Sequence, residues 1–277
     1  MRWAFVGTVF AAMAGALTAS AAPNGPVQVA DDRDSQQVDV ELVLAVDVSY
    51  SMDTDELAIQ REGYAQALVS NEFLKTLKTG PNGRIAVTYF EWAASGDQKI
   101  ILPWQIIDGP ESADAVASVI LKTPLRRASR TSISGAISFA MPLFEQNPYH
   151  GIRRVIDISG DGPNNNGAPV TTARDAAVEK GIVINGLPIM IKEPSFSTMD
   201  IDNLDEYYED CVIGGPGAFV VTIKDRDKFK EAIHTKLVME VAGRIPPNYV
   251  MRVADAQRQP RVSCLIGEKI WQDRWGR

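Results

Sequence analysis

A short stretch of the chain places three oxygen-bearing side chains at alternate positions after an apolar run. The run ELVLAV ends at Val46, and Asp47, Ser49 and Ser51 follow within the sequence AVDVSYSMD. Carboxylate and hydroxyl oxygens are the ligands of hard divalent cations such as Mg²⁺, which takes them in octahedral geometry. These residue types indicate a cation site; the alternative is that the two serines only cap a following helix.

The spacing of the serines sets a condition on such a site. Residues two apart on an extended strand lie about 6.6 Å apart, whereas a ligand oxygen lies about 2.1 Å from Mg²⁺. Ser49 and Ser51 can therefore share an ion only if the chain curls after Val48. A helix predicted to begin at Thr54 favours this curl, because the strand must end directly before it.

Two further oxygen-bearing residues occupy comparable places in the chain. Thr131 stands just before a predicted helix, and Asp161 stands in a Gly-Asp-Gly turn after a predicted buried strand. Taken singly, Thr131 is typical of a helix cap and Asp161 of a turn. Together with Asp47, Ser49 and Ser51 they form a set of five that we expect at one edge of a sheet.

Segments rich in Val and Ile alternate with helical patterns along the chain. Strands are expected over residues 42–46, 84–92, 99–104, 154–159, 182–188 and 218–223, of which the second and third form a hairpin. Helical segments are expected over residues 54–77, 110–121, 132–145, 171–180, 204–209 and 225–242. This alternation predicts an α/β fold with a doubly wound, mostly parallel sheet and helices on both faces. Ligands of such sheets bind at the carboxyl ends of the strands, where the five residues fall.

Three blocks of sequence, in order, carry a family resemblance. DVSYSM, RTSISGAI and VIDISGDG are similar to the motifs of the von Willebrand factor type A domain with its metal-ion-dependent adhesion site, and the resemblance covers residues 38–242. It implies a Rossmann-like fold, direct metal contacts from Ser49, Ser51 and Thr131, and coordinated waters held by Asp47 and Asp161. The sixth ligand is then a Glu or Asp carboxylate of a protein partner. Within the family, RRVIDISGDGPNNNG and YYEDCVIGGPGAFV resemble an uncharacterised exported bacterial subgroup.

Three features depart from that pattern or add to it. Tyr50 stands between the two serines where a small residue is common, and alternation predicts that it points away from the metal. Asp157 lies within a buried strand, where a carboxylate needs hydrogen-bonding or charged partners. We favour a structural role, as a group bonded to the backbone, over a role in which it holds a metal ligand in place. The asparagines at 164–166 are interpreted as a polar loop.

The N-terminus has the pattern of a secretory signal peptide. Arg2 precedes an apolar stretch over residues 5–17 and the small-residue site Ala19-Ser20-Ala21, and the alternative is a buried N-terminal helix. The predicted organisation is a signal peptide at 1–22, a flexible segment at 23–37, a von Willebrand factor A-like domain at 38–243 and a tail at 244–277 packed on or tethered to it. The mature chain is expected to be exported, to the periplasm or the medium, without a membrane span.

Composition limits the remaining possibilities. The formal net charge of −7 argues against a nucleic-acid partner. Cys211 and Cys264 are the two cysteines, and in an exported chain they favour one disulfide over two buried thiols. Only two histidines are present, which leaves little material for a His-based zinc site.

The leading functional hypothesis is an exported, adhesion-type binding module that holds Mg²⁺, or another divalent cation such as Mn²⁺ or Ca²⁺, and engages an acidic group of a protein partner. A metal-independent scaffold is the second hypothesis. A hydrolase with Asp47 as nucleophile is the third; it is disfavoured because Ser49 stands where such enzymes place a second carboxylate. Nucleotide-binding, serine-hydrolase and zinc-protease motifs do not occur in the sequence. The oligomeric state is left open.

Overall fold

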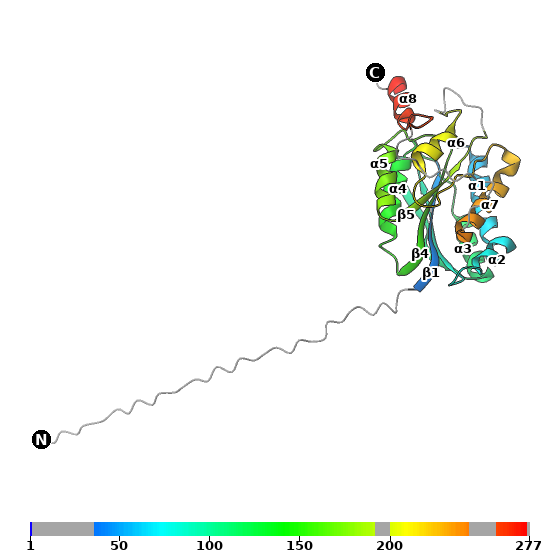
Figure 1. Ribbon diagram of the computed structural model, residues 1–277, viewed down its shortest axis with the longest axis vertical. Coiled ribbons are helices and arrows are strands. Elements are labelled where there is room, and N and C mark those ends of the chain that lie inside the picture. Colours follow the sequence, from blue (N-terminus) through cyan, green and yellow to red (C-terminus); the bar gives the residue numbers. More distant parts are fainter. Residues whose placement is uncertain (2–35, 192–199, 244–258, 276–277) are drawn as a thin grey trace. The chain divides into compact units, whose positions relative to one another are not determined.

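A five-stranded sheet runs through the computed structural model, which describes residue 1 and residues 36–191, 200–243 and 259–275. The strands are β1 (Gln36–Asp47), β2 (Ile85–Trp92), β3 (Gln98–Ile107), β4 (Tyr149–Gly160) and β5 (Ile182–Pro188). Their order is β3-β2-β1-β4-β5, with β3 antiparallel to β2 and the other pairs parallel (Figure 1). The mostly parallel α/β fold predicted from the sequence is confirmed, and so is the hairpin of β2 and β3.

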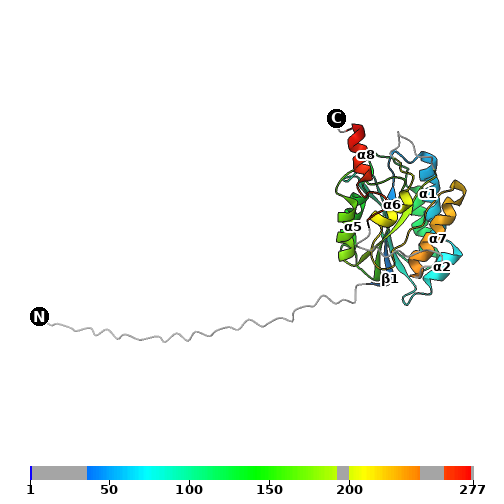
Figure 2. The same ribbon diagram turned by 45° about the horizontal axis from the view of Figure 1, so that its top comes forward.

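Helices cover both faces of the sheet (Figures 1 and 2). One face carries α1 (Thr54–Leu68), α2 (Asn71–Leu77), α3 (Pro110–Lys122) and α7 (Phe229–Ala242), and the other carries α4 (Ile133–Leu143) and α5 (Val170–Glu179). Two further helices, α6 (Leu204–Tyr207) and α8 (Ile266–Trp275), lie near the carboxyl ends of the strands (Figure 1). No helix in the described ranges has the length and apolar character needed to cross a membrane.

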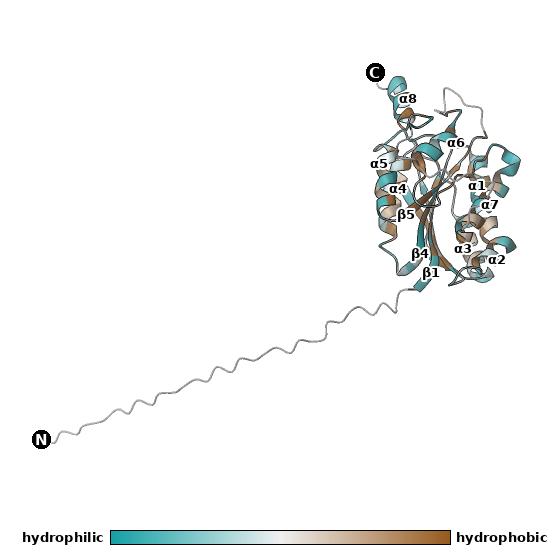
Figure 3. Ribbon diagram, viewed as in Figure 1, coloured by the Kyte–Doolittle hydropathy of each residue, from teal (hydrophilic) through white to brown (hydrophobic). Residues whose placement is uncertain are grey.

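The central strand β1 contributes to the cores on both faces. Leu42 and Leu44 pack in the core beneath α1 and α7, whereas Val43 and Ala45 pack in the core beneath α4. Successive side chains of a strand point to opposite faces, so a strand covered on both sides must be apolar throughout. The hydropathy colouring follows this pattern, with apolar residues along the strands (Figure 3).

The N-terminal predictions fall largely outside the described residues. The signal peptide predicted at 1–22 lies, apart from Met1, outside them. The flexible segment predicted to extend to residue 37 is too long, because Gln36 and Gln37 already belong to β1. They pair with Tyr149 and His150 of β4, so the sheet begins two residues before the predicted start of the domain.

The single helix predicted over residues 54–77 is wrong, because it is two helices. α1 ends at Leu68, and α2 begins at Asn71. Ser70 between them has extended backbone angles, and its hydroxyl accepts a hydrogen bond from the backbone N–H of Phe73 at 3.2 Å. A serine that caps a new helix in this way interrupts the preceding one, although the apolar spacing continues across the break.

Two predictions near the C-terminus also need correction. The strand predicted over residues 218–223 makes only isolated bridges, between Val220 and Gly186 of β5 and between Ile223 and Ile189 just after β5. Pro188, at the end of β5, has no N–H to donate, which interrupts a regular ladder. The tail, for which the sequence indicated no period, contains α8.

Candidate metal centre

The chain curls at the end of β1 as the predicted site requires. The backbone N–H of Ser49 donates to Asp47 Oδ1 at 2.7 Å, which turns the chain away from the strand direction. The hydroxyls of Ser49 and Ser51 then lie 2.8 Å apart, within hydrogen-bond distance. Two side chains that an extended strand would hold more than twice as far apart thus converge.

Neither serine caps the helix that follows. Asp53 is the N-cap of α1: its side chain accepts the N–H of Glu56, and the Glu56 side chain accepts the N–H of Asp53 in return. This capping box satisfies the start of the helix without Ser49 or Ser51. The interpretation of the two serines as helix caps is therefore wrong.

Parallel pairing of β1 with β4 brings Asp161 to the same place. Val46 pairs with Ser159 in the sheet, so the residues that follow each strand meet at one edge. The Ser51 hydroxyl donates to Asp161 Oδ1 at 2.6 Å, across 110 positions of sequence. Ser49, Ser51 and Asp161 therefore form one hydrogen-bonded chain of oxygens next to Asp47.

Thr131 lies beside this cluster. Its backbone exchanges hydrogen bonds with Asn165, at 3.0 Å from its N–H to Asn165 Oδ1 and at 2.8 Å from the Asn165 N–H to its carbonyl. A Cβ added to Gly162 would lie 4.0 Å from the Thr131 hydroxyl, which places that hydroxyl against the Asp161–Gly162 turn. Within the described residues it makes no hydrogen bond to the two serines or the two aspartates.

The loop before α4 is held in an unusual conformation. Arg130 has a φ of 77°, in the left-handed region that non-glycine residues seldom adopt. On one side Ala128 donates to the carbonyl of Val48 at 2.9 Å, and on the other Ser132 donates to the carbonyl of Ala93 at 2.8 Å. Ser132, rather than Thr131, caps α4 by accepting the N–H of Gly135. The Thr131 side chain is therefore not used as a cap.

Sequence reasoning missed the role of the asparagines at 164–166. Each accepts a backbone N–H: Asn164 from Ser134 in the first turn of α4 at 3.0 Å, Asn165 from Thr131 just before α4 at 3.0 Å, and Asn166 from Ser95 between β2 and β3 at 2.8 Å. Asn164 is fully buried. They position the loops around the site. The run of three asparagines directly after Gly-Asp-Gly was the available signal.

The electrostatics of Asp47 fit a bound cation. Asp47 is fully buried, and its Oδ2 has no hydrogen-bond partner among the described residues. Burial raises the pKa of this carboxyl from 3.8 to about 7, against the lowering effect of its hydrogen bonds with Ser49. A buried carboxylate oxygen without a donor is costly, and a nearby cation would compensate it.

The space beside Asp47 depends on a glycine. A Cβ added to Gly160 would lie 2.9 Å from Asp47 Oδ2 and 3.0 Å from the Tyr208 hydroxyl. A side chain at this position would displace one of those oxygens. The residues present therefore fit a divalent ion: two carboxylates and three hydroxyls, with one buried carboxylate oxygen that has no hydrogen-bond partner among the described residues.

The two other residues singled out from the sequence have different roles. Tyr50 points outward, with 61 % of its surface exposed, as alternation predicted. Asp157 is fully buried and forms an ion pair with Lys236 of α7 at 2.7 Å. It thus joins the sheet to a helix, which is a structural role as favoured from the sequence, although the partner is a lysine side chain and not the backbone.

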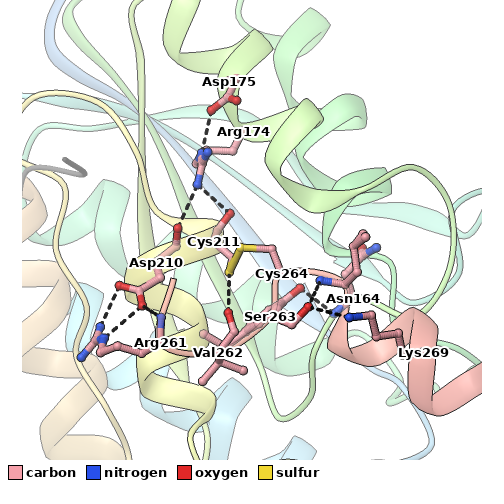
Figure 4. The surroundings of a disulfide bond; sticks show 12 residues. Asn164, Arg174, Asp175, Asp210, Cys211, Arg261, Val262, Ser263, Cys264 and Lys269 are labelled. Atoms are coloured by element: carbon pink, nitrogen blue, oxygen red, sulfur yellow. Dashed lines mark hydrogen bonds and ion pairs between the residues drawn. A yellow bond between two sulfur atoms is a disulfide. The ribbon is translucent and has the colours of Figure 1, made fainter. Parts of the chain in front are cut away.

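A disulfide fastens the tail beside the site. Cys211 and Cys264 are bonded, as the sequence favoured, and α8 follows directly after Cys264 (Figure 4). On the loop side, Asn164 Nδ2 donates to Glu268 Oε1 at 2.7 Å. Gly267 packs so closely that an added Cβ would lie 2.1 Å from the Asn164 carbonyl oxygen. The described part of the tail is therefore packed on the loop that carries Asp161.

Comparison with known sequences identifies a family. Residues 37–245 match the family described as "Protein of unknown function (DUF1194)". The chain belongs to the DUF1194 family. This is an uncharacterised family, as the resemblance indicated. No curated protein matches this DUF1194 chain.

Solved structures show what fold the DUF1194 chain has. A structure of the pilus adhesin SpaC from Lactobacillus rhamnosus GG matches with a TM-score of 0.55 and 11% identity over 75% of this chain and 31% of SpaC. Proximal thread matrix protein 1 from the mussel byssus, "with zinc occupied MIDAS motif", matches with a TM-score of 0.50 and 15% identity over 75% of this chain and 49% of that one. A von Willebrand factor type A structure from Catenulispora acidiphila matches with a TM-score of 0.49 and 15% identity over 74% and 43%.

The matches to SpaC and to the mussel protein show that the chain shares their fold, and the sheet is the doubly wound α/β sheet expected from the sequence. The chain spans about half the length of the first structures that it matches, and identities this low show the fold alone. Among the residues that the structure describes, no three His, Cys, Asp or Glu side chains gather as a metal cluster. The candidate centre has a different composition, because it combines two carboxylates with three hydroxyls.

Proposed function

We propose that the chain is an exported protein-binding module of the adhesion type, which holds a divalent cation, Mg²⁺ in the first instance, at Asp47, Ser49, Ser51, Thr131 and Asp161. The observation that carries the proposal is the convergence of three of these side chains beside the unpartnered oxygen of Asp47. Adjacent ligand oxygens around an octahedral Mg²⁺ lie about 3 Å apart. The separations of 2.8 Å and 2.6 Å between the Ser49, Ser51 and Asp161 oxygens are close to that value.

The charges at the site support an acidic partner. Hydroxyls are neutral ligands, and the resemblance implies that the two carboxylates act through coordinated waters, so the charge of the ion is only weakly neutralised. A divalent ion held in this way attracts a further carboxylate, and Mg²⁺ retains water molecules that such a group can replace. A Glu or Asp side chain of a protein partner is the expected incoming ligand.

Three other findings support the proposal by analogy or context. The mussel protein carries a zinc-occupied MIDAS motif, and SpaC is a pilus adhesin. One protein of similar fold thus holds a divalent ion, and another is an adhesin. The Cys211–Cys264 disulfide favours an oxidising location outside the cytoplasm, because cytosolic thiols are kept reduced.

The test compares metal binding by two double variants. Ser49→Ala/Ser51→Ala should abolish Mg²⁺ binding measured by titration calorimetry, and circular dichroism should show an unchanged fold, because neither serine caps α1. Ser118→Ala/Ser138→Ala is the matched control, since these serines lie on α3 and α4 away from the site. Unchanged Mg²⁺ affinity in the first variant would refute the site.

A second experiment addresses the partner. The chain, immobilised and exposed to an exported protein fraction, should retain a partner in Mg²⁺ and release it in chelator. The Ser49→Ala/Ser51→Ala variant should retain none under either condition. Retention that is insensitive to metal would favour the scaffold hypothesis instead.

A further inference from the structure

Two arginines beside the candidate metal centre have no acidic partner among the residues that the structure describes. The loop LRRASR contains Arg126, Arg127 and Arg130. Arg126 is used structurally, in ion pairs with Glu91 at 3.1 Å and Asp97 at 2.8 Å. Arg127 and Arg130 form no ion pair with any residue that the structure describes. The chain has a net charge of −7, so two neighbouring arginines without an ion pair among the described residues are unexpected.

Each of these arginines is held against an aromatic ring. The Arg127 guanidinium lies 5.4 Å from the centre of the Tyr50 ring, and its Nη2 donates to the Tyr50 carbonyl at 2.5 Å. The Arg130 guanidinium lies 3.1 Å from the centre of the Trp271 ring on α8. A stacked guanidinium keeps its N–H edge available, and that edge matches a carboxylate in two parallel hydrogen bonds.

Two of these four residues adjoin proposed metal ligands in the sequence. Tyr50 lies between Ser49 and Ser51, and Arg130 directly precedes Thr131. Ala128, between the two arginines, forms a bridge with Ser49. We refer to Tyr50, Arg127, Arg130 and Trp271 as the arginine rim.

The tail fixes one half of the arginine rim. α8 is fastened by the disulfide at Cys264 and by the Asn164–Glu268 hydrogen bond, so Trp271 is held in place beneath Arg130. The Arg130 backbone is in the left-handed region, and its guanidinium lies against that ring. The tether thus holds in place the ring on which one of the two arginines stacks.

From this arrangement we propose that the arginine rim selects protein segments with several neighbouring carboxylates, one for the metal and the others for Arg127 and Arg130. The inference rests on the proposed function and names the partner class for it. A metal ion alone accepts any accessible Glu or Asp. The arginine rim adds the requirement for an acidic cluster, and the paired N–H edges favour planar carboxylates.

The test uses the full chain and three synthetic peptides of equal length. The peptides carry one Glu in a Gly-Ser background, a cluster of four Glu in the same background, or the same cluster with Gln in place of Glu. The variant is Arg127→Gln/Arg130→Gln, and Arg127→Gln alone avoids the left-handed position. Lys75→Gln/Lys180→Gln is the charge-matched control, because both lysines are exposed, on α2 and at the end of α5.

Affinities are measured by fluorescence anisotropy in Mg²⁺, with Mg²⁺ affinity measured separately by calorimetry. The wild type should bind the four-Glu peptide about tenfold more tightly than the one-Glu peptide, as expected for two added ion pairs. The arginine double variant should lose that difference and keep its Mg²⁺ affinity, and Arg127→Gln should lose part of it. The control should behave as wild type, and the Gln peptide should not bind.

Three results would overturn the inference. In one, the arginine double variant binds both Glu peptides as the wild type does; in another, it loses affinity for both equally. In the third, heparin competes for the arginine rim more strongly than the four-Glu peptide, because a sulfated polymer would then be the better ligand. If the proposed function fails, the result is different, because the wild type then binds no Mg²⁺. The contribution of the two arginines to peptide affinity can still be measured in that case, by comparing the wild type with the arginine double variant in chelator.

Discussion

Two buried aspartates show how residue environment separates a structural carboxylate from a candidate ligand. Asp39 accepts hydrogen bonds from the backbone and side chain of Asn82, at 2.9 Å and 3.0 Å, and from the backbone of Arg84 at 3.3 Å. Asp47 accepts the N–H of Ser49 with one oxygen, and the described part of the chain offers no donor to the other. Of these two aspartates, only Asp47 has a carboxylate oxygen that a bound cation would compensate.

Opposite effects on stability are therefore expected when each aspartate becomes asparagine. Without metal at pH 8, Asp47→Asn should raise the free energy of unfolding by about 1 kcal/mol or more, because it removes an uncompensated buried charge. It should also eliminate the rise in melting temperature that Mg²⁺ produces. Asp39→Asn should lower stability by a similar amount and leave that rise intact. Urea unfolding with and without Mg²⁺ measures both; a loss of stability in Asp47→Asn without metal would contradict the assignment.

The sequence predicted part of this site and could not predict the rest. Ser49, Ser51 and Asp161 follow strands whose neighbours could be inferred, so their meeting at one edge was predictable from sheet topology. The asparagines at 164–166 act through contacts with residues far away in the sequence, with Thr131 across 34 positions and with Ser134 across 30. Such contacts have no local signature, because a polar loop and a loop-positioning element have the same composition.

At the scale of elements, α7 is joined to the sheet through a buried charged network. Lys236 Nζ lies 2.7 Å from Asp157 of β4 and 2.6 Å from Glu240 one turn further along α7. Asn185 of β5 donates to the other Glu240 oxygen at 2.7 Å. All three charged side chains are fully buried, so each one depends on the others for compensation.

Removing the central cation should be severely destabilising. Lys236→Met leaves two buried carboxylates facing each other, and we expect the free energy of unfolding to fall by about 3–5 kcal/mol. Lys230→Met on the same helix is the control, because Lys230 pairs with Glu62 at the surface and should change stability by less than about 1 kcal/mol. Chemical denaturation of both variants measures the difference, and equal losses would show that the network contributes no more than a surface pair.

The elements that could be predicted are those specified by local pattern. β5, with boundaries equal to the prediction, is a short apolar run between a turn and a proline. α8 was missed because it is stabilised by contacts with distant residues, the disulfide and Asn164 among them. The division between α1 and α2 was missed because the apolar residues of both face α7 and so keep one period.

On the scale of the whole molecule, stability should depend on pH through buried carboxyls. Burial raises the pKa of Asp157 from 3.8 to about 6, and the charge of Glu240 adds to this rise. Lys236 acts in the opposite direction, and Tyr64 of α1 also faces the carboxyl group. The native state thus holds this proton more tightly than the unfolded chain does. Stability conferred by the proton is lost as the pH rises from about 4 to about 6.

A comparison of two pH values isolates this contribution. Between pH 4.5 and pH 6.5, in chelator, the free energy of unfolding of the wild type should fall by more than that of Asp157→Asn, whatever the absolute stability of the variant. Urea denaturation at each pH provides the four values. Equal changes in the two proteins would contradict a raised pKa at Asp157.

The disulfide also acts on the whole chain. It closes a loop of 53 residues, for which chain entropy predicts a contribution of about 4 kcal/mol. Cys211→Ser/Cys264→Ser should lower the free energy of unfolding by up to that amount and should release α8 from the loop at 164. Hydrogen exchange at residues 266–275 should then accelerate, while exchange in β1 stays slow until global unfolding. Unchanged exchange in α8 would show that packing alone holds it.

The two borders of the sheet have a consequence for how this protein can associate. Beyond β5, the backbone at Gly214 and Val220 already forms bridges to Ile184 and Gly186 of the last strand, and Ile223 forms one to Ile189 just after it. The opposite border, β3, carries Pro103, which has no N–H to offer, and exposed Lys99, whose charge disfavours an added strand. Copies of the chain at high concentration should therefore resist joining edge to edge into fibres. Recognition of other proteins is then expected to use side chains, because neither edge of the sheet readily accepts a strand from another chain.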